Sequence, residues 1–185
     1  MKKIKNNNGF TLVELLAVIV VLAIVMGLAV VGISSVLENT RKSAFAADAK
    51  SFLEGAHTLV NNADISRMMG TDPMGIAIDC KTNKTTRYIP LELIPVEQGG
   101  KKSPYGNPYT MGSATSATTT APAGSYIQVD GQINTTTDSP NNGKCMYTYH
   151  IFLTDGVYAV EGSTKGSPVE EKDVSNSSVK TALTS

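Results

Sequence analysis

Several residue types are scarce in this 185-residue chain, and each scarcity narrows the functions it can have. Tryptophan is absent and aromatic residues make up only 6% of the chain, which excludes a core built mainly on large rings. Sixteen basic residues balance sixteen acidic ones, so the composition gives no reason to infer a nucleic-acid partner. The two histidines, His57 and His150, belong to no zinc, nucleotide-binding or nucleophile motif. We therefore expect a protein that is not an enzyme, with no catalytic residue, metal or cofactor.

Charged residues are missing from one long segment near the N-terminus. Residues 1–9 (MKKIKNNNG) hold three lysines, and between Lys5 and Glu38 the only charged residue is Glu14. The uncharged residues from Leu15 to Leu37 would span about 34 Å as a helix, against about 30 Å of hydrocarbon in a bilayer. Lysines before such a segment favour a cytoplasmic N-terminus. The chain beyond Leu37 is then expected to lie outside the cytoplasm.

Two common kinds of apolar segment fit this pattern poorly. A secretory signal peptide has a shorter apolar region, followed closely by a cleavage site of small residues. Here the run is long, and Arg41 and Lys42 separate it from the triplet at residues 44–46. A single-pass anchor explains the length and the lysines but not Glu14. A carboxylate in an apolar helix costs about 2.5–3.5 kcal/mol at the bilayer centre, so Glu14 needs a reason to be there.

The six residues GFTLVE, at positions 9–14, supply such a reason. With the basic leader before them and the apolar run after them, they resemble the processing motif of type IV prepilins. The resemblance implies that a membrane prepilin peptidase cuts between Gly9 and Phe10 and methylates the new amine of Phe10. In a helix that amine would lie about one turn from Glu14, and pairing would offset the cost of burying either charge. The pair can form within one chain, but the family favours a contact between neighbouring subunits that sets their axial register.

The resemblance implies a structural subunit of a type IV pilus, used in adhesion or motility. The chain would begin as a membrane precursor with a cytoplasmic N-terminus and end in an extracellular filament on the cell surface. Its expected partners are further copies of itself, minor pilins, the prepilin peptidase, a membrane assembly platform and, before assembly, the membrane.

Two alternatives stay open. The first is a pseudopilin of a type II secretion or competence machine, because residues 104–109 (PYGNPY) resemble a loop of major pseudopilins. The second is a singly anchored extracellular binding domain that does not assemble, for which Glu14 would be dispensable.

Beyond the apolar run, the sequence predicts an α+β fold. Apolar residues recur at helical spacing after the run: Phe45, Ala49, Phe52, Ala56, Leu59, Val60 and Ala63. This pattern predicts a helix from Phe10 to Asn62, with Met69-Gly70 as a stop signal. Its second half is expected to pack on an antiparallel sheet. The expected organisation is a leader at 1–9, a membrane and filament-core helix at 10–37, an amphipathic helix at 38–69 and a β-sheet head at 70–185.

Short local patterns predict the pieces of the head. Two Asp-Gly dipeptides, at 130–131 and 155–156, lie between β-forming residues and predict tight hairpins. Residues 76–78 and 88–89 are expected to be extended, and residues 113–125 and 134–143 to be loops. The chain from Gly162 onward is expected to be a polar tail, with a short helix capped at residues 167–170.

Cysteine is as scarce as histidine. Cys80 and Cys145 are the only two cysteines, and both follow the apolar run. A disulfide between them is permitted outside the cytoplasm. Pairing also requires their Cα atoms to lie within about 7 Å, which the sequence leaves open.

Overall fold

The computed structural model describes residues 11–72, 74–80, 84–95, 101–112, 115–137 and 139–182, with only the backbone of residues 30–32. The chain divides into two compact units, Met1–Thr40 and Arg41–Ser185. The helix α1, Leu12–Met68, runs through both of them. It continues past Asn62 and stops at Met69-Gly70, where Gly70 has a φ of +83° that favours glycine.

The second unit, which we call the head, contains a six-stranded antiparallel sheet. Its strands are β1 (Thr85–Pro90), β2 (Tyr126–Ile133), β3 (Cys145–Thr154), β4 (Tyr158–Val160), β5 (Val169–Glu170) and β6 (Val179–Thr181). They follow the order β1-β2-β3-β4-β6, and β5 pairs with β3. Short 3-10 helices lie at Leu91–Leu93, Glu171–Asp173 and Asn176–Ser178. The expected α+β fold is confirmed.

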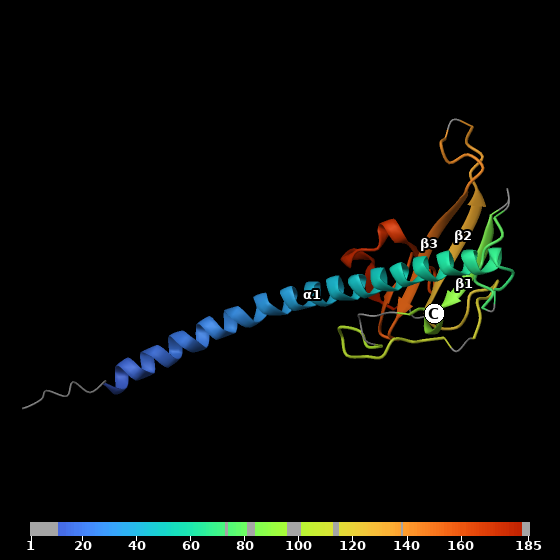
Figure 1. The fold of residues 1–185 in the computed structure, drawn as a ribbon. Helices are drawn as coiled ribbons and strands as arrows, with labels where there is room; N and C mark the ends of the chain where they lie inside the picture. The colour runs from blue at the N-terminus through green and yellow to red at the C-terminus, as the bar shows by residue number, and fades with distance from the viewer. Residues whose placement is uncertain are drawn as a thin grey trace, which may run out of the picture. The chain divides into compact units, whose positions relative to one another are not determined.

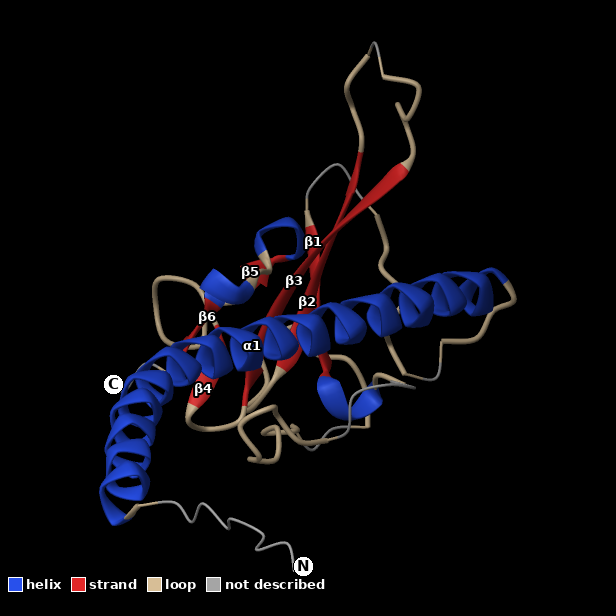
Figure 2. Cartoon of the chain, turned by 90° about the vertical axis from the view of Figure 1, so that its left-hand side faces the viewer, coloured by secondary structure: helices blue, strands red, loops and turns tan. Residues whose placement is uncertain are grey.

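The head part of α1 packs on one face of this sheet, across β1, β2 and β3 (Figures 1 and 2). The apolar stripe read from the sequence is the packing face, since Phe45, Ala49 and Phe52 are all buried. Leu53 is also buried and was missing from the predicted stripe. The sheet contributes apolar residues from alternate positions, such as Ile127 and Val129 on β2. Each buried large side chain contributes about 1.5–3 kcal/mol, so this face accounts for much of the head's stability.

One of the two predicted Asp-Gly hairpins is confirmed. Asp155 and Gly156 form the turn between β3 and β4, and Gly156 has a φ of +87°. The Asp155 carboxylate accepts hydrogen bonds from the backbone N–H groups of Val157 and Tyr158, at 2.9 and 2.7 Å. The side chain therefore fixes the turn, while the glycine supplies the backbone conformation.

The hairpin predicted at Asp130-Gly131 is wrong, because β2 runs straight through both residues. A Cβ atom on Gly131 would lie 2.5 Å from Cγ2 of Ile78 and 3.1 Å from Sγ of Cys80. This glycine therefore allows close packing inside the sheet rather than a turn. The chain turns instead between Ile133 at the end of β2 and Cys145 at the start of β3, where a loop was expected over residues 134–143.

Residues 76–78, expected to be extended, are buried and belong to no strand of the sheet. The N–H groups of Ile76 and Ala77 donate to the side chain of Asp72. One other local prediction is wrong. The chain after Gly162 is not a polar tail with a capped helix at 167–170. It forms β5 and β6, in which Val169 pairs with Ile151 of β3 and Val179 with Val160 of β4, and it buries Val174 and Val179.

Candidate functional site

The first turn of α1 is closed by a reciprocal pair of side chains, Thr11 and Glu14. The backbone N–H and the hydroxyl of Thr11 each donate to Oε2 of Glu14 at 2.9 Å, and the N–H of Glu14 donates to the Thr11 hydroxyl at 3.3 Å. This arrangement is a capping box, which satisfies N–H groups that a helix start leaves unpaired. Sequence reasoning assigned Glu14 only to the Phe10 amine and missed Thr11. The Thr-x-x-Glu spacing of the capping box was the signal available to find it.

The other residues of the first half of α1 present an apolar surface. The large apolar side chains that the structure describes between Leu12 and Leu37 are about half exposed or more, reaching 80% at Leu12 and 75% at Leu28. By length and composition this helix is able to cross a membrane. An exposed apolar surface of this extent is a binding surface, for lipid or for another protein.

The remaining predicted site residues fall in different places. Gly9 and Phe10, the predicted cleavage and methylation positions, lie outside the residues that the structure describes. Glu14 belongs to the first unit, whereas Cys80 and Cys145 belong to the head. The two cysteines form a disulfide, with their Cα atoms 5.7 Å apart. It links the segment that follows α1 to the first residue of β3.

Two tyrosine hydroxyls form hydrogen bonds that connect the head part of α1 to the rest of the head. The Tyr109 hydroxyl donates to Oδ2 of Asp48 at 2.6 Å, and the Tyr147 hydroxyl donates to Asp64. The ring of Tyr109 also contacts Phe45 edge-on, with 5.3 Å between centroids. Residues 104–109, the loop with the pseudopilin-like sequence, are thereby held against the helix through Tyr109. Burial, and then the hydrogen bond to Asp48, raises the pKa of Tyr109 well above its usual range.

Both histidines lie against other parts of the head. His57 Nε2 lies 3.0 Å from Oε2 of Glu171, and its ring stacks on Tyr149 with 3.8 Å between centroids. His150 Nδ1 lies 3.6 Å from Oδ2 of Asp130. The described residues contain no group of three or more histidine, cysteine or acidic side chains placed to hold a metal ion.

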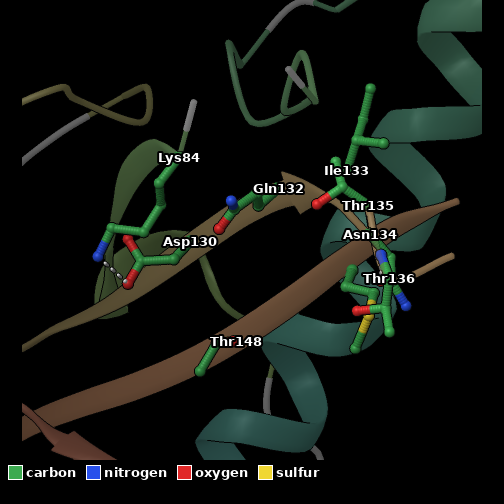
Figure 3. Close-up of a pocket in the computed structure, with 9 residues that line it drawn as sticks. Lys84, Asp130, Gln132, Ile133, Asn134, Thr135, Thr136 and Thr148 are labelled. Atoms are coloured by element: carbon green, nitrogen blue, oxygen red, sulfur yellow. Dashed lines mark hydrogen bonds and ion pairs between the residues drawn. The ribbon is translucent and has the colours of Figure 1, made fainter. Parts of the chain in front are cut away.

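A polar groove of about 290 Å³ lies beside Asp130 (Figure 3). Asp130 is only 5% exposed and accepts hydrogen bonds from Thr86 Oγ1 at 2.6 Å, Gln128 Nε2 at 3.0 Å and Lys84 Nζ at 3.2 Å. Burial on its own would raise the pKa of Asp130, but these three donors together lower it below the usual value. The carboxylate is therefore held in its charged form in the floor of the groove.

Comparison with known proteins identifies one stretch of the chain. Residues 4–30 match the family model of the prokaryotic N-terminal methylation motif. The match covers the last six residues of the leader, with Lys5, and then the Gly9–Phe10 junction, the Thr11–Glu14 pair and more than half of the apolar run. Neither a search of curated proteins nor a search of solved structures found a protein that matches this chain.

Proposed function

Because the chain carries at residues 4–30 the signature of type IV pilins and pseudopilins, we propose that it is the filament-forming subunit of a type IV pilus. In this proposal residues 1–9 are a leader removed by cleavage after Gly9, and the new amine on Phe10 is methylated. Residues 10–37 anchor the precursor in the membrane and then form the filament core. Residues 38–69 form the amphipathic helix of the head, and residues 70–185 form the rest of the head on the filament surface.

One observation carries the proposal. Among the described residues, the hydrophobic core of the head is built from residues between Phe45 and Val179, all of which belong to the head itself. The first half of α1 is apolar, and its described large side chains are exposed. It is therefore free to exchange one apolar environment, lipid, for another, the helices of neighbouring copies.

Glu14 makes the exchange favour the bundle of neighbouring helices over lipid. Lipid is as apolar as leucine, so moving an apolar helix from lipid into a bundle gains little from the hydrophobic effect. A polar pair between copies then contributes disproportionately. Both donors from Thr11 use Oε2 of Glu14. Within the described part of the chain, the other oxygen, Oε1, accepts no hydrogen bond and can take one from the methylated amine of a neighbour.

The pseudopilin alternative has one observation in its favour. The loop at residues 104–109, which resembles a pseudopilin loop, is packed on α1 through Tyr109 rather than left free at the surface. A pseudopilin would be processed in the same way as a pilin but would remain in a short rod at the cell envelope.

The N-terminus and intact mass of the chain, measured separately in sheared surface material and in membranes, test the proposal. We expect chains in the sheared fraction to begin at Phe10 and to be heavier than the bare chain by one methyl group. Processed chains confined to the envelope would favour the pseudopilin. A chain beginning at Met1 and confined to membranes would indicate a plain anchor, and a start near Ala47 would indicate a signal peptide.

A further inference from the structure

The groove beside Asp130 lies on the face of the sheet that α1 does not cover. Ile127 and Val129 on β2 point into the core under α1, so the alternating residues Gln128 and Asp130 point to the opposite face. The groove is formed there by the ends of β2 and β3 and by the first residues of their connecting loop (Figure 3).

The charges that line this groove cancel. Lys84 is the only cationic side chain among the described lining residues, and its Nζ lies 3.2 Å from Oδ2 of Asp130. The Lys84 side chain is 57% exposed whereas that of Asp130 is 5% exposed, so the ammonium forms part of the rim and the carboxylate part of the floor. A charged ligand would gain little net attraction, and a nucleic acid would need several unpaired cations.

The rest of the lining combines hydrogen-bonding groups with apolar surface. Hydroxyls come from the exposed residues Thr135 and Thr148, and amides come from Gln132 and Asn134. Apolar surface comes from Ile133 and Met146. Met146 is 50% exposed although it lies within a strand. A sugar has the matching chemistry, because its hydroxyls both donate and accept hydrogen bonds while its C–H faces pack on apolar side chains.

We propose that this groove binds a neutral carbohydrate, of one or two sugar units. A peptide strand is less suitable, because β2 is paired on both sides along residues 126–131, and Gln132 and Ile133 beyond them are too short a length to hold an added strand. The small volume and open position predict weak binding, with a Kd on the order of 1–10 mM for a monosaccharide. The proposal does not depend on filament assembly, and either can fail without the other.

Saturation-transfer difference NMR on the full-length chain in nanodiscs tests it. The probes are glucose, galactose, N-acetylglucosamine and N-acetylgalactosamine, with glucuronic acid as an anionic probe. We expect saturation transfer to at least one neutral sugar, with affinity unchanged between about 50 and about 500 mM NaCl, since no net charge is involved. Thr148→Val keeps the shape of an exposed side chain and should weaken binding at least about threefold through one lost hydrogen bond.

Thr58→Val is the matched control, because Thr58 is an exposed threonine on α1 whose hydroxyl donates to the Glu54 carbonyl. It should bind sugar like the unmodified chain, and circular dichroism should show both variants folded. No transfer to any neutral sugar at about ten times the expected Kd would overturn the proposal. So would equal binding by Thr148→Val and the unmodified chain, or salt-sensitive binding of glucuronic acid alone.

Discussion

Removal of the Cys80–Cys145 disulfide should destabilise the head by a calculable amount. The bridge joins residues 65 positions apart. Closing a loop of that length restricts the unfolded chain by an entropy worth about 4 kcal/mol at 25 °C. The double variant Cys80→Ala, Cys145→Ala should therefore unfold about 4 kcal/mol more easily, a large fraction of the 5–15 kcal/mol typical of a domain.

Urea denaturation of residues 41–185, followed by circular dichroism, measures this loss, because every core residue that the structure describes lies in that unit. With an m-value of about 2 kcal/mol/M, the midpoint should fall by about 2 M. The unmodified chain with its disulfide reduced is the control and should match the double variant. A fall of less than about 0.5 M would refute the entropy argument, because it would correspond to only about 1 kcal/mol.

Gly131→Ala tests the same region without replacing a cysteine. The added Cβ would lie 3.1 Å from Sγ of Cys80 and 2.5 Å from Cγ2 of Ile78, so one of them must move. We expect incomplete disulfide formation, visible as free thiol in mass-spectrometric labelling. Complete oxidation with an unchanged urea midpoint would contradict the packing role of this glycine.

Three further predictions concern single side chains. Glu14→Gln should reduce filament yield more than tenfold, counted by electron microscopy of sheared material, because a charge-assisted hydrogen bond contributes about 1.5–3 kcal/mol per subunit. The control is Glu54→Gln, at an exposed glutamate on the head part of α1, which should assemble normally. Equal filament yields from the two variants would count against the assembly role of Glu14. The pKa of Asp130 is lower in the folded head than in the unfolded chain, so its charged carboxylate stabilises the head at pH above the unfolded pKa. This contribution is lost as pH falls from the unfolded pKa through the folded one, so the melting temperature should fall there. The fall should be smaller in Asp130→Asn. Burial first, and then the charges of Asp64 and Glu171, raise the pKa of Tyr149 to about 12. The contribution of Tyr149 to the stability of the head is therefore intact below its unfolded pKa of about 10 and is lost as pH rises towards 12. Tyr149→Phe should flatten the resulting alkaline decline in melting temperature, and an unchanged decline would exclude Tyr149 as its cause.

The sequence predicted the parts of the fold that depend on regular spacing. The stripe from Phe45 to Val60 repeats every three or four residues because a helix buries one face, so its packing face was readable without the sheet. Asp155-Gly156 was readable because its turn is fixed by neighbours within three residues. In both cases the cause of the structure lies close by in the chain.

The failures arose where the cause lies far away in the chain. Gly131 carries the same local signal as Gly156, but it is required by Ile78 and Cys80, whose approach no local pattern reveals. Val169 and Val179 lie in strands of two and three residues that exist only because β3 and β4 pair with them. At the N-terminus, the capping role of Thr11 was missed because the unusual charge at Glu14 already had an explanation.

The loop between β2 and β3 is closed at its base by hydrogen bonds, and this makes it suitable for peptide display. Asn134 is joined to Lys144 and Gly143 by backbone hydrogen bonds of 2.9 and 2.8 Å, and the disulfide at Cys145 holds the next residue. The turn at residues 139–142 beyond this closure is largely exposed and contributes nothing to the core. A foreign epitope inserted there would leave the anchored base intact. In a helical polymer it would be repeated once per subunit, giving a regularly spaced array of antigen or affinity tag along the fibre.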